Sequence, residues 1–68
     1  MSVLKVIEIL ANSSSSWDDA AQQAVNEASK SVKNIKSVYV NELNGRVENN
    51  KIVEYRINAK ITFEVNSW

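Results

Sequence analysis

Cysteine, histidine and proline are absent from this 68-residue sequence, and glycine occurs once, as Gly45. Without cysteine there is no disulfide bond or zinc–thiolate site, and without histidine neither a Ser-His-Asp triad nor a Cys-His pair can be built. The scarcity of glycine and proline argues against long flexible linkers. We therefore expect a single domain over residues 1–68 with no catalytic residues.

Charge of either sign is not in excess, because eight basic side chains balance eight acidic ones. Nucleic-acid binding needs clustered Lys and Arg. The one small cluster is formed by Lys30, Lys33 and Lys36. It lies where we expect a helix to end, and the negative end of the helix dipole favours cations there. No apolar run approaches the roughly 20 residues of a membrane span. Lys5 and Glu8 interrupt any signal-peptide core. We expect a cytoplasmic protein without nucleic-acid or membrane partners.

The short length creates a stability problem that the sequence must solve. Hydrophobic residues make up 44% of the chain, which is typical of a folded domain. A chain of this size buries only about 60% of its unfolded surface, so small domains usually add disulfides, a metal or self-association. Since disulfides and sites built from His or Cys are excluded, we expect self-association.

The first half of the chain predicts a strand followed by a helix. Residues 3–11 are apolar on both faces, which indicates a strand covered on both sides. Residues 12–16 are polar turn formers, Ser16 suits a helix N-cap, and Asp18 and Asp19 suit a first turn. Asn34 is the expected helix stop. The apolar positions that share one predicted helical face are Trp17, Ala21, Ala24, Ala28, Val32 and Ile35.

The second half predicts a long hairpin. Apolar and polar residues alternate strictly from Val53 to Val65, which indicates a strand with one packed and one polar face. Its partner is the stretch 35–48, with a bulge expected either between Val40 and Leu43 or at Gly45. Asn44-Gly45 and Asn49-Asn50 are competing turn signals. Only a turn over residues 48–51 leaves a partner long enough, so we place the hairpin there.

These elements predict an α+β fold of order β-α-β-β. We expect a three-stranded antiparallel sheet with strand order 1-3-2, partly wrapped around one helix. Such a sheet has two open edges and one uncovered polar face. Exposed edges favour pairing with other chains, which supports the expectation of self-association.

The sequence resembles the dodecins, small β-α-β-β proteins of bacteria and archaea. The resemblance covers about residues 5–65 and depends on the order and spacing of Lys5-Val6-Ile7-Glu8-Ile9, the stretch SSSSWDDAA at 13–21, Gly45, Glu54-Tyr55 and Phe63. It implies a hollow homododecamer with its helices outside. It also implies binding of riboflavin or FMN for storage and protection rather than catalysis.

The resemblance also implies where a flavin would lie. In the family, a Trp on the second strand stacks on the flavin ring and a Gln after the Glu-Tyr pair hydrogen-bonds it. Here Ser37 and Arg56 occupy these positions, Asn44 stands where some FMN-binding members have Arg, and Glu64 where Arg is frequent. Serine offers no π face, so we expect an altered flavin site.

We predict cofactor contacts at Ser37, Tyr39, Asn44 and Arg56. Tyr39 shares the strand face of Ser37, and the Arg56 guanidinium can stack on a ring, so a displaced flavin site is one alternative. The other is that Arg56 pairs with Glu54, Glu64 or an acid of a neighbouring subunit. Asn58 and Lys60 are expected to line the same polar face.

Calcium is the remaining cofactor alternative, because some dodecin-like proteins without the Trp are described as calcium-binding. The candidate carboxylates are Glu8, Asp18, Asp19 and Glu64, and no calcium loop of the D-x-D-x-D-G type is present. We therefore predict no metal ligand set within one chain; a calcium site would form between subunits. Trp17 is expected to anchor the core or an interface, and Trp68 to lie in a tail.

Overall fold

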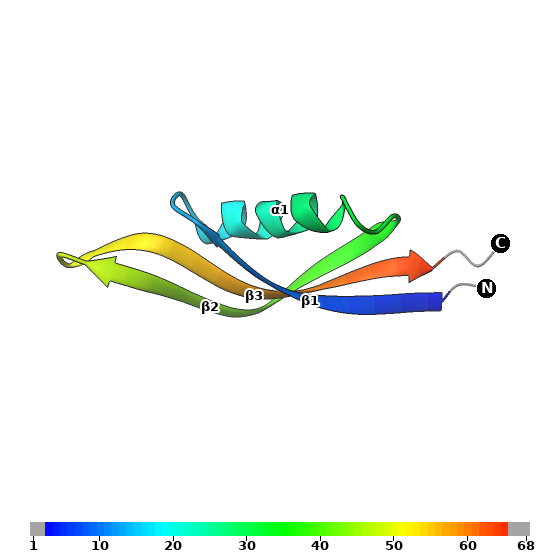
Figure 1. The fold of residues 1–68 in the computed structure, drawn as a ribbon. Helices are drawn as coiled ribbons and strands as arrows, with labels where there is room; N and C mark the ends of the chain where they lie inside the picture. The colour runs from blue at the N-terminus through cyan, green and yellow to red at the C-terminus, as the bar shows by residue number, and fades with distance from the viewer. Residues whose placement is uncertain (1–2, 66–68) are drawn as a thin grey trace.

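The computed structural model describes residues 3–65 and confirms the predicted architecture. The elements are β1 (Val3–Ser13), α1 (Trp17–Ala28), β2 (Ile35–Glu48) and β3 (Lys51–Val65). The three strands form one antiparallel sheet in the order β1-β3-β2, with α1 lying along one face (Figure 1). Within the described range, helical structure is too short and too polar for a membrane crossing. Trp68, expected in a tail, lies outside these residues.

The core lies between α1 and β3. Ile57, Ala59 and Ile61 are buried on the helix-facing side of β3, as its alternating pattern predicts. Opposite them, the buried helix residues are Ala20, Ala24 and Ala28. Alanine at these positions lets the helix approach the sheet closely. The core is nevertheless small, because Ile61 is the largest fully buried side chain among the described residues.

The start of α1 is fixed by a group of serine side chains. The Ser16 Oγ accepts a hydrogen bond from the Asp19 backbone N–H at 2.9 Å, which confirms the predicted N-cap. The buried Ser13 hydroxyl donates to the Asp19 carboxylate at 2.6 Å and accepts from the Ser15 N–H at 2.9 Å. The serine-rich segment thus joins the end of β1 to the first turn of the helix.

The end of α1 differs from the prediction. The helix stops at Ala28 instead of near Asn34, and Ala20 rather than Ala21 is fully buried. Ser29 caps the helix, and its hydroxyl donates to the Asn26 carbonyl at 2.6 Å, a local bond that competes with helix continuation. Asn34 adopts a left-handed conformation (φ 61°) before β2 instead.

The lysine cluster therefore lies beyond the helix, and its predicted role as dipole partner is wrong. No basic residue occupies the last turn of α1. Lys30 instead pairs with Glu27 at 3.0 Å, and Lys36 on β2 pairs with Glu64 on β3 at 3.6 Å. All four side chains are at least one-third exposed, so these pairs contribute little stability.

The hairpin turns at Asn49-Asn50, as predicted. Both residues have positive φ, 52° and 65°, the conformation of the tight turns that match strand twist. The register shifts between Val40 and Glu42, where a bulge was expected. The alternative position at Gly45 is wrong, because Gly45 pairs regularly with Tyr55 and the next shift lies between Arg46 and Val47.

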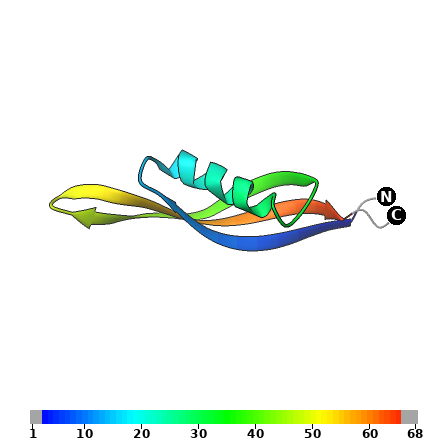
Figure 2. The ribbon, with the colours of Figure 1, turned by 45° about the horizontal axis from the view of Figure 1, so that its top comes forward.

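A single chain leaves much apolar surface exposed. The helix packs mainly over β1 and β3, and the β2–β3 hairpin extends beyond it in an elongated molecule of 53 × 19 × 13 Å (Figures 1 and 2). On the face of β1 away from the helix, Leu4, Val6 and Leu10 are 57%, 57% and 78% exposed. The prediction that β1 is covered on both faces is therefore wrong for one chain, because the fold has a single helix and a single sheet. Other exposed apolar residues are Val38, Leu43, Val47 and Ile52.

Candidate functional site

The sheet face away from the helix carries polar residues in rows across the three strands. One row contains Asn12, Arg56 and Asn44, which are partners in the β1–β3 and β3–β2 registers. The adjacent row contains Leu10, Asn58 and Glu42. These rows lie side by side because alternate residues of a strand point to the same face.

A hollow of about 320 Å³ lies over these two rows; we call it the strand hollow. Arginine, glutamate and asparagine side chains give it hydrogen-bond donors and acceptors beside an apolar part. The Oδ1 atom of Asn58 is buried and has no hydrogen-bond partner in the described residues. A buried acceptor without a partner is costly, so this atom suits a ligand or water that donates to it. The lining residues are Leu10, Ala11, Asn12, Glu42, Asn44, Arg56, Ile57 and Asn58.

Two of the four predicted cofactor-binding residues meet in the strand hollow. Asn44 and Arg56 are direct partners in the register and both line it. Ser37 and Tyr39 do not line it, since they lie opposite Thr62 and Lys60 further along β3. At about 3.3 Å per residue, Arg56 is roughly 20 Å along β3 from the Ser37 row and roughly 13 Å from the Tyr39 row.

This separation decides how a flavin could fit. No aromatic side chain lines the strand hollow, so one chain offers no ring for stacking beside Arg56. The exposed Tyr39 ring (63%) lies too far along the sheet to serve there. Hence the strand hollow of one chain offers Arg56 no aromatic neighbour for a flavin ring, and Ser37 and Tyr39 lie outside it.

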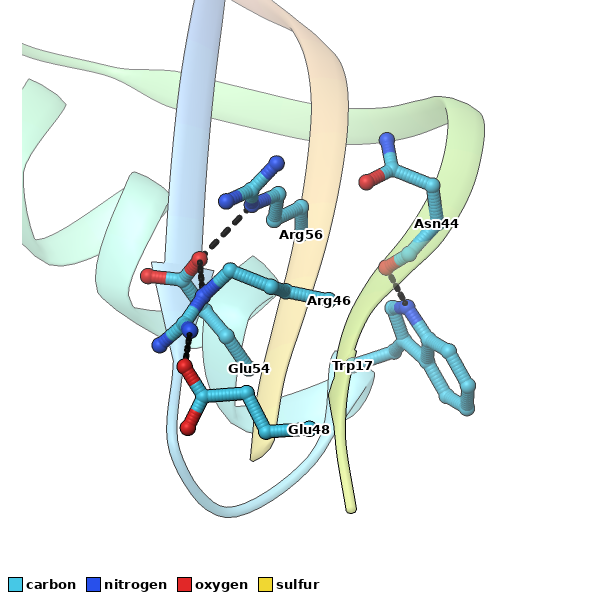
Figure 3. A network of polar contacts seen from close by, with 6 residues as sticks. All are labelled: Trp17, Asn44, Arg46, Glu48, Glu54 and Arg56. Atoms are coloured by element: carbon cyan, nitrogen blue, oxygen red, sulfur yellow. Dashed lines mark hydrogen bonds and ion pairs between the residues drawn. The ribbon is translucent and has the colours of Figure 1, made fainter. Parts of the chain in front are cut away.

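Arg56 is held by acids of its own chain. Its Nε atom donates to Glu54 Oε1 at 2.7 Å, and Arg46 Nε donates to the same oxygen at 3.4 Å (Figure 3). Arg46 also pairs with Glu48. Hydrogen bonding from Arg56, followed by its charge and that of Arg46, lowers the pKa of Glu54 against the opposing effect of desolvation. Of the two acids considered within the chain, Arg56 therefore pairs with Glu54, whereas Glu64 pairs with Lys36.

The calcium candidates are dispersed. Asp18 and Asp19 lie in the first helical turn, whereas Glu8 and Glu64 lie on β1 and β3 and face Lys60 and Leu4 in the register. Across residues 3–65, no three acidic side chains are grouped closely enough to hold a metal ion. The oxygen ligands that calcium requires are thus not grouped among residues 3–65 of one chain.

Trp17 forms a contact behind the strand hollow that the sequence did not reveal. Its indole N–H donates to the Asn44 carbonyl oxygen at 2.8 Å (Figure 3). Its ring meets Tyr55 edge-to-face with centroids 4.8 Å apart. Trp17 also packs against the core residues Ala20 and Ile57, as expected of an anchor. The hydrogen bond had no sequence signal, because it joins residues 27 positions apart.

Other lining residues were also missed. Leu10 was assigned to strand packing, and Asn12 to a turn, although both lie on the polar face through pairing with Asn58 and Arg56. Glu42 was not considered, but the predicted bulge after Val40 contained the signal. A bulge changes the face on which later residues point, and it brings Glu42 opposite Asn58.

One helix on a 1-3-2 antiparallel sheet, with a polar hollow on the face away from the helix, defines a small α+β chain. The dodecin family model matches residues 3–66, and the chain belongs to the dodecin family. Dodecins are non-enzymatic ligand-binding proteins, which confirms the expectation that this chain is not an enzyme.

Three similarities illustrate the relationship. The chain is 38% identical to "Calcium dodecin" of Mycobacterium tuberculosis over 65 residues, 96% of this chain and 92% of that protein. A crystal structure described as calcium dodecin from the same species, a calcium-chelating immunodominant antigen, has a TM-score of 0.80 at 35% identity, with 96% of this chain and 93% of that chain covered. The tt0972 protein of Thermus thermophilus has a TM-score of 0.93 at 22% identity with complete coverage of both chains. The last similarity supports the fold alone.

Proposed function

We propose that this chain assembles into a hollow homododecamer that binds and sequesters small ligands on the sheet face away from the helix. The observation that carries the proposal is the strand hollow, which contains Asn44 and Arg56 but leaves Ser37 and Tyr39 outside it. A complete site of the family type therefore needs two copies of the chain. Exposed apolar residues on β1 and β2 supply surface for such contacts.

In this proposal the flavin site is altered. Ser37 replaces the stacking Trp that the family resemblance implies, and Arg56 replaces the hydrogen-bonding Gln. The Arg56 guanidinium is already engaged by Glu54 at 2.7 Å, so it is less available to a ligand. A flavin ring that packs against Ser37 gains none of the π stacking that a Trp side chain supplies. Weak flavin binding through a displaced site at Tyr39 and Arg56 is the competing form of the same proposal.

Two measurements on the purified full-length protein test it. Size-exclusion chromatography with light scattering should give a mass of about 91 kDa, twelve times the 7.6 kDa chain; a 7.6 kDa monomer would refute assembly. Riboflavin and FMN are then titrated while flavin fluorescence is followed. We expect no quenching in the micromolar range; micromolar quenching by wild type would establish the displaced site instead.

Calcium binding is the second candidate, supported by the 38% identity to calcium dodecin. Because one chain groups no three acids within residues 3–65, the ion would be held by oxygens from more than one subunit. Elemental analysis after dialysis against a calcium-containing buffer would detect stoichiometric calcium. An assembled protein free of both calcium and flavin would favour the structural alternative, a particle without a specific organic ligand.

A further inference from the structure

The Trp17 contact joins the helix to the part of β2 that forms a wall of the strand hollow. The indole N–H donates to Asn44 across 2.8 Å, and no other hydrogen bond in residues 3–65 links α1 to β2. The helix packs mainly on β1 and β3. This segment of β2 is otherwise positioned through its pairing with β3, so the Trp17 side chain is its one direct hydrogen-bonded link to the helix among the described residues.

The local structure leaves Trp17 little freedom. Its ring lies against Tyr55 at an interplanar angle of 82°, and it packs on the core beside Ala20. Gly45 lies beside the indole, and a Cβ atom there would lie 3.8 Å from the Trp17 ring, an ordinary contact distance. The indole is thus fixed on several sides, which allows its single N–H to act as a positional restraint.

The restrained residue contributes to the strand hollow. Figure 3 shows the Asn44 carbonyl directed to Trp17 and the Asn44 amide directed the opposite way, on the side of Arg56. Asn44 is the register partner of Arg56, and both line the hollow. Two residues beyond Asn44, Arg46 shares the Glu54 carboxylate with Arg56. A shift of β2 at Asn44 would therefore change the environment of the Arg56 guanidinium.

We propose that Trp17 is a positioning residue for the strand hollow: its indole N–H fixes β2 at Asn44 and thereby places Asn44 and Arg56 for ligand contact. The inference depends on the proposed function only in treating the hollow as a ligand site. It assigns to the helix N-terminus an effect on the opposite face of the sheet. No contact between Trp17 and the ligand is involved.

The test replaces the N–H without changing the ring. Trp68→Phe first leaves Trp17 as the one tryptophan of the sequence. In this background, Trp17→benzothienylalanine places sulfur where the indole has its N–H group. Trp17→Phe is a second variant that keeps an aromatic ring. Arg46 and Arg56 are the two arginines of the sequence, so ¹⁵N-arginine labelling gives two Nε–H signals. We expect the Arg56 signal to shift. Hydrogen exchange at residues 43–47 should be about fivefold faster, the effect of one lost hydrogen bond.

The control and the contrary outcomes are defined by the same readouts. Tyr55→Phe keeps both rings and the Trp17 N–H, so both arginine signals should remain in place. Unchanged arginine signals and exchange in the Trp17 variants would overturn the proposal. Faster exchange spread equally to the core at Ile57–Ile61 would also overturn it, because it would indicate general destabilisation. None of these readouts needs a ligand, so a failure of flavin or calcium binding remains distinguishable.

Discussion

Asn44 and Arg56 lie directly opposite each other on β2 and β3 and line the same hollow on the face away from the helix. Ser37, on the same strand as Asn44, lies opposite Thr62 instead. Within one chain, Ser37 and Arg56 are thus separated along the sheet. In the proposed assembly, contacts between copies would determine whether they meet.

Restoring the family's two flavin contacts should create flavin binding. The double variant Ser37→Trp/Arg56→Gln supplies an aromatic face and an amide in place of a hydroxyl and a paired guanidinium. Stacking of a ring on an aromatic side chain is worth about 1–3 kcal/mol, or roughly a 5- to 150-fold gain in affinity. Quenching of riboflavin fluorescence measures the gain relative to wild type.

The matched control for this variant is Ser37→Leu/Arg56→Gln, which adds bulk without a π face. It should quench riboflavin no more than wild type does. Equal quenching by the Leu and Trp variants would show that the hydrophobic area, and not stacking, had been missing. Light scattering on each variant verifies that the assembly is intact.

A charge on the uncovered face of β1 should disrupt assembly. Val6 is 57% exposed in the single chain, so Val6→Asp has little effect on folding if that surface remains in water. If another copy covers it, an unpaired buried carboxylate costs several kcal/mol, and the mass should fall below about 91 kDa. Asn26→Asp adds the same charge on the exposed side of α1 and should leave the mass unchanged. A Val6→Asp protein of full mass would exclude this surface from the subunit contacts.

Gly45 should not tolerate a side chain. An added Cβ would lie 3.1 Å from Ile52 Cγ2 and 3.3 Å from the Glu54 carbonyl oxygen. The cost of such overpacking, about 1–3 kcal/mol, exceeds the roughly 0.5–1 kcal/mol gained by replacing glycine in a strand. Gly45→Ala should therefore lower the midpoint of urea denaturation. In Gly45→Ala/Ile52→Ala, which removes Cγ2, the two effects should be less than additive; strict additivity would place the strain elsewhere.

The Glu54 carboxylate should make stability depend on pH in the acid range. Hydrogen bonds from Arg56 and Arg46 lower its pKa in the folded chain, whereas the unfolded value is near 4.3. A lowered carboxyl pKa stabilises the fold above the unfolded value, and this contribution is lost as the pH falls through the folded value. The stability difference between wild type and Glu54→Gln should shrink from pH 6 to pH 3.

Salt provides the check on that interpretation. The pairs around Glu54 are partly exposed, so 1 M NaCl should screen them and reduce the pH-dependent difference between wild type and Glu54→Gln. A difference that is constant from pH 6 to pH 3 would mean that the charge of Glu54 does not contribute to stability. Urea denaturation at each pH measures both effects.

The sequence predicted the elements whose signals are local. Alternation over β3 identified both faces of the central strand, and the length of that alternation selected Asn49-Asn50 over Asn44-Gly45 as the turn. Ser16 was recognised as the N-cap for the same reason, since its hydrogen bond reaches only Asp19. Strand order followed from the direction in which the helix carries the chain across the sheet.

The remaining features depend on contacts that sequence patterns do not encode. The helix ends at Ala28, where Ser29 forms a local hydrogen bond to the Asn26 carbonyl, whereas the apolar spacing continues to Ile35 and predicted a longer helix. The distance between Ser37 and Arg56 required the register of β2, which three shifts make irregular. The Trp17–Asn44 bond required the helix to be placed on the sheet first.

The two strands of the hairpin should differ in their tolerance of insertions and deletions. From Ile57 to Ile61, β3 pairs with β1 without interruption and each residue also has a partner on β2, so the loss or gain of one residue would exchange the core face with the polar face. Two of the three register shifts, between Ile35 and Ser37 and between Val40 and Glu42, leave an extra residue on β2, which shows that the ladder can absorb a residue on this strand. During evolution, changes of chain length are therefore expected to accumulate at the sheet edge and to be excluded from its centre.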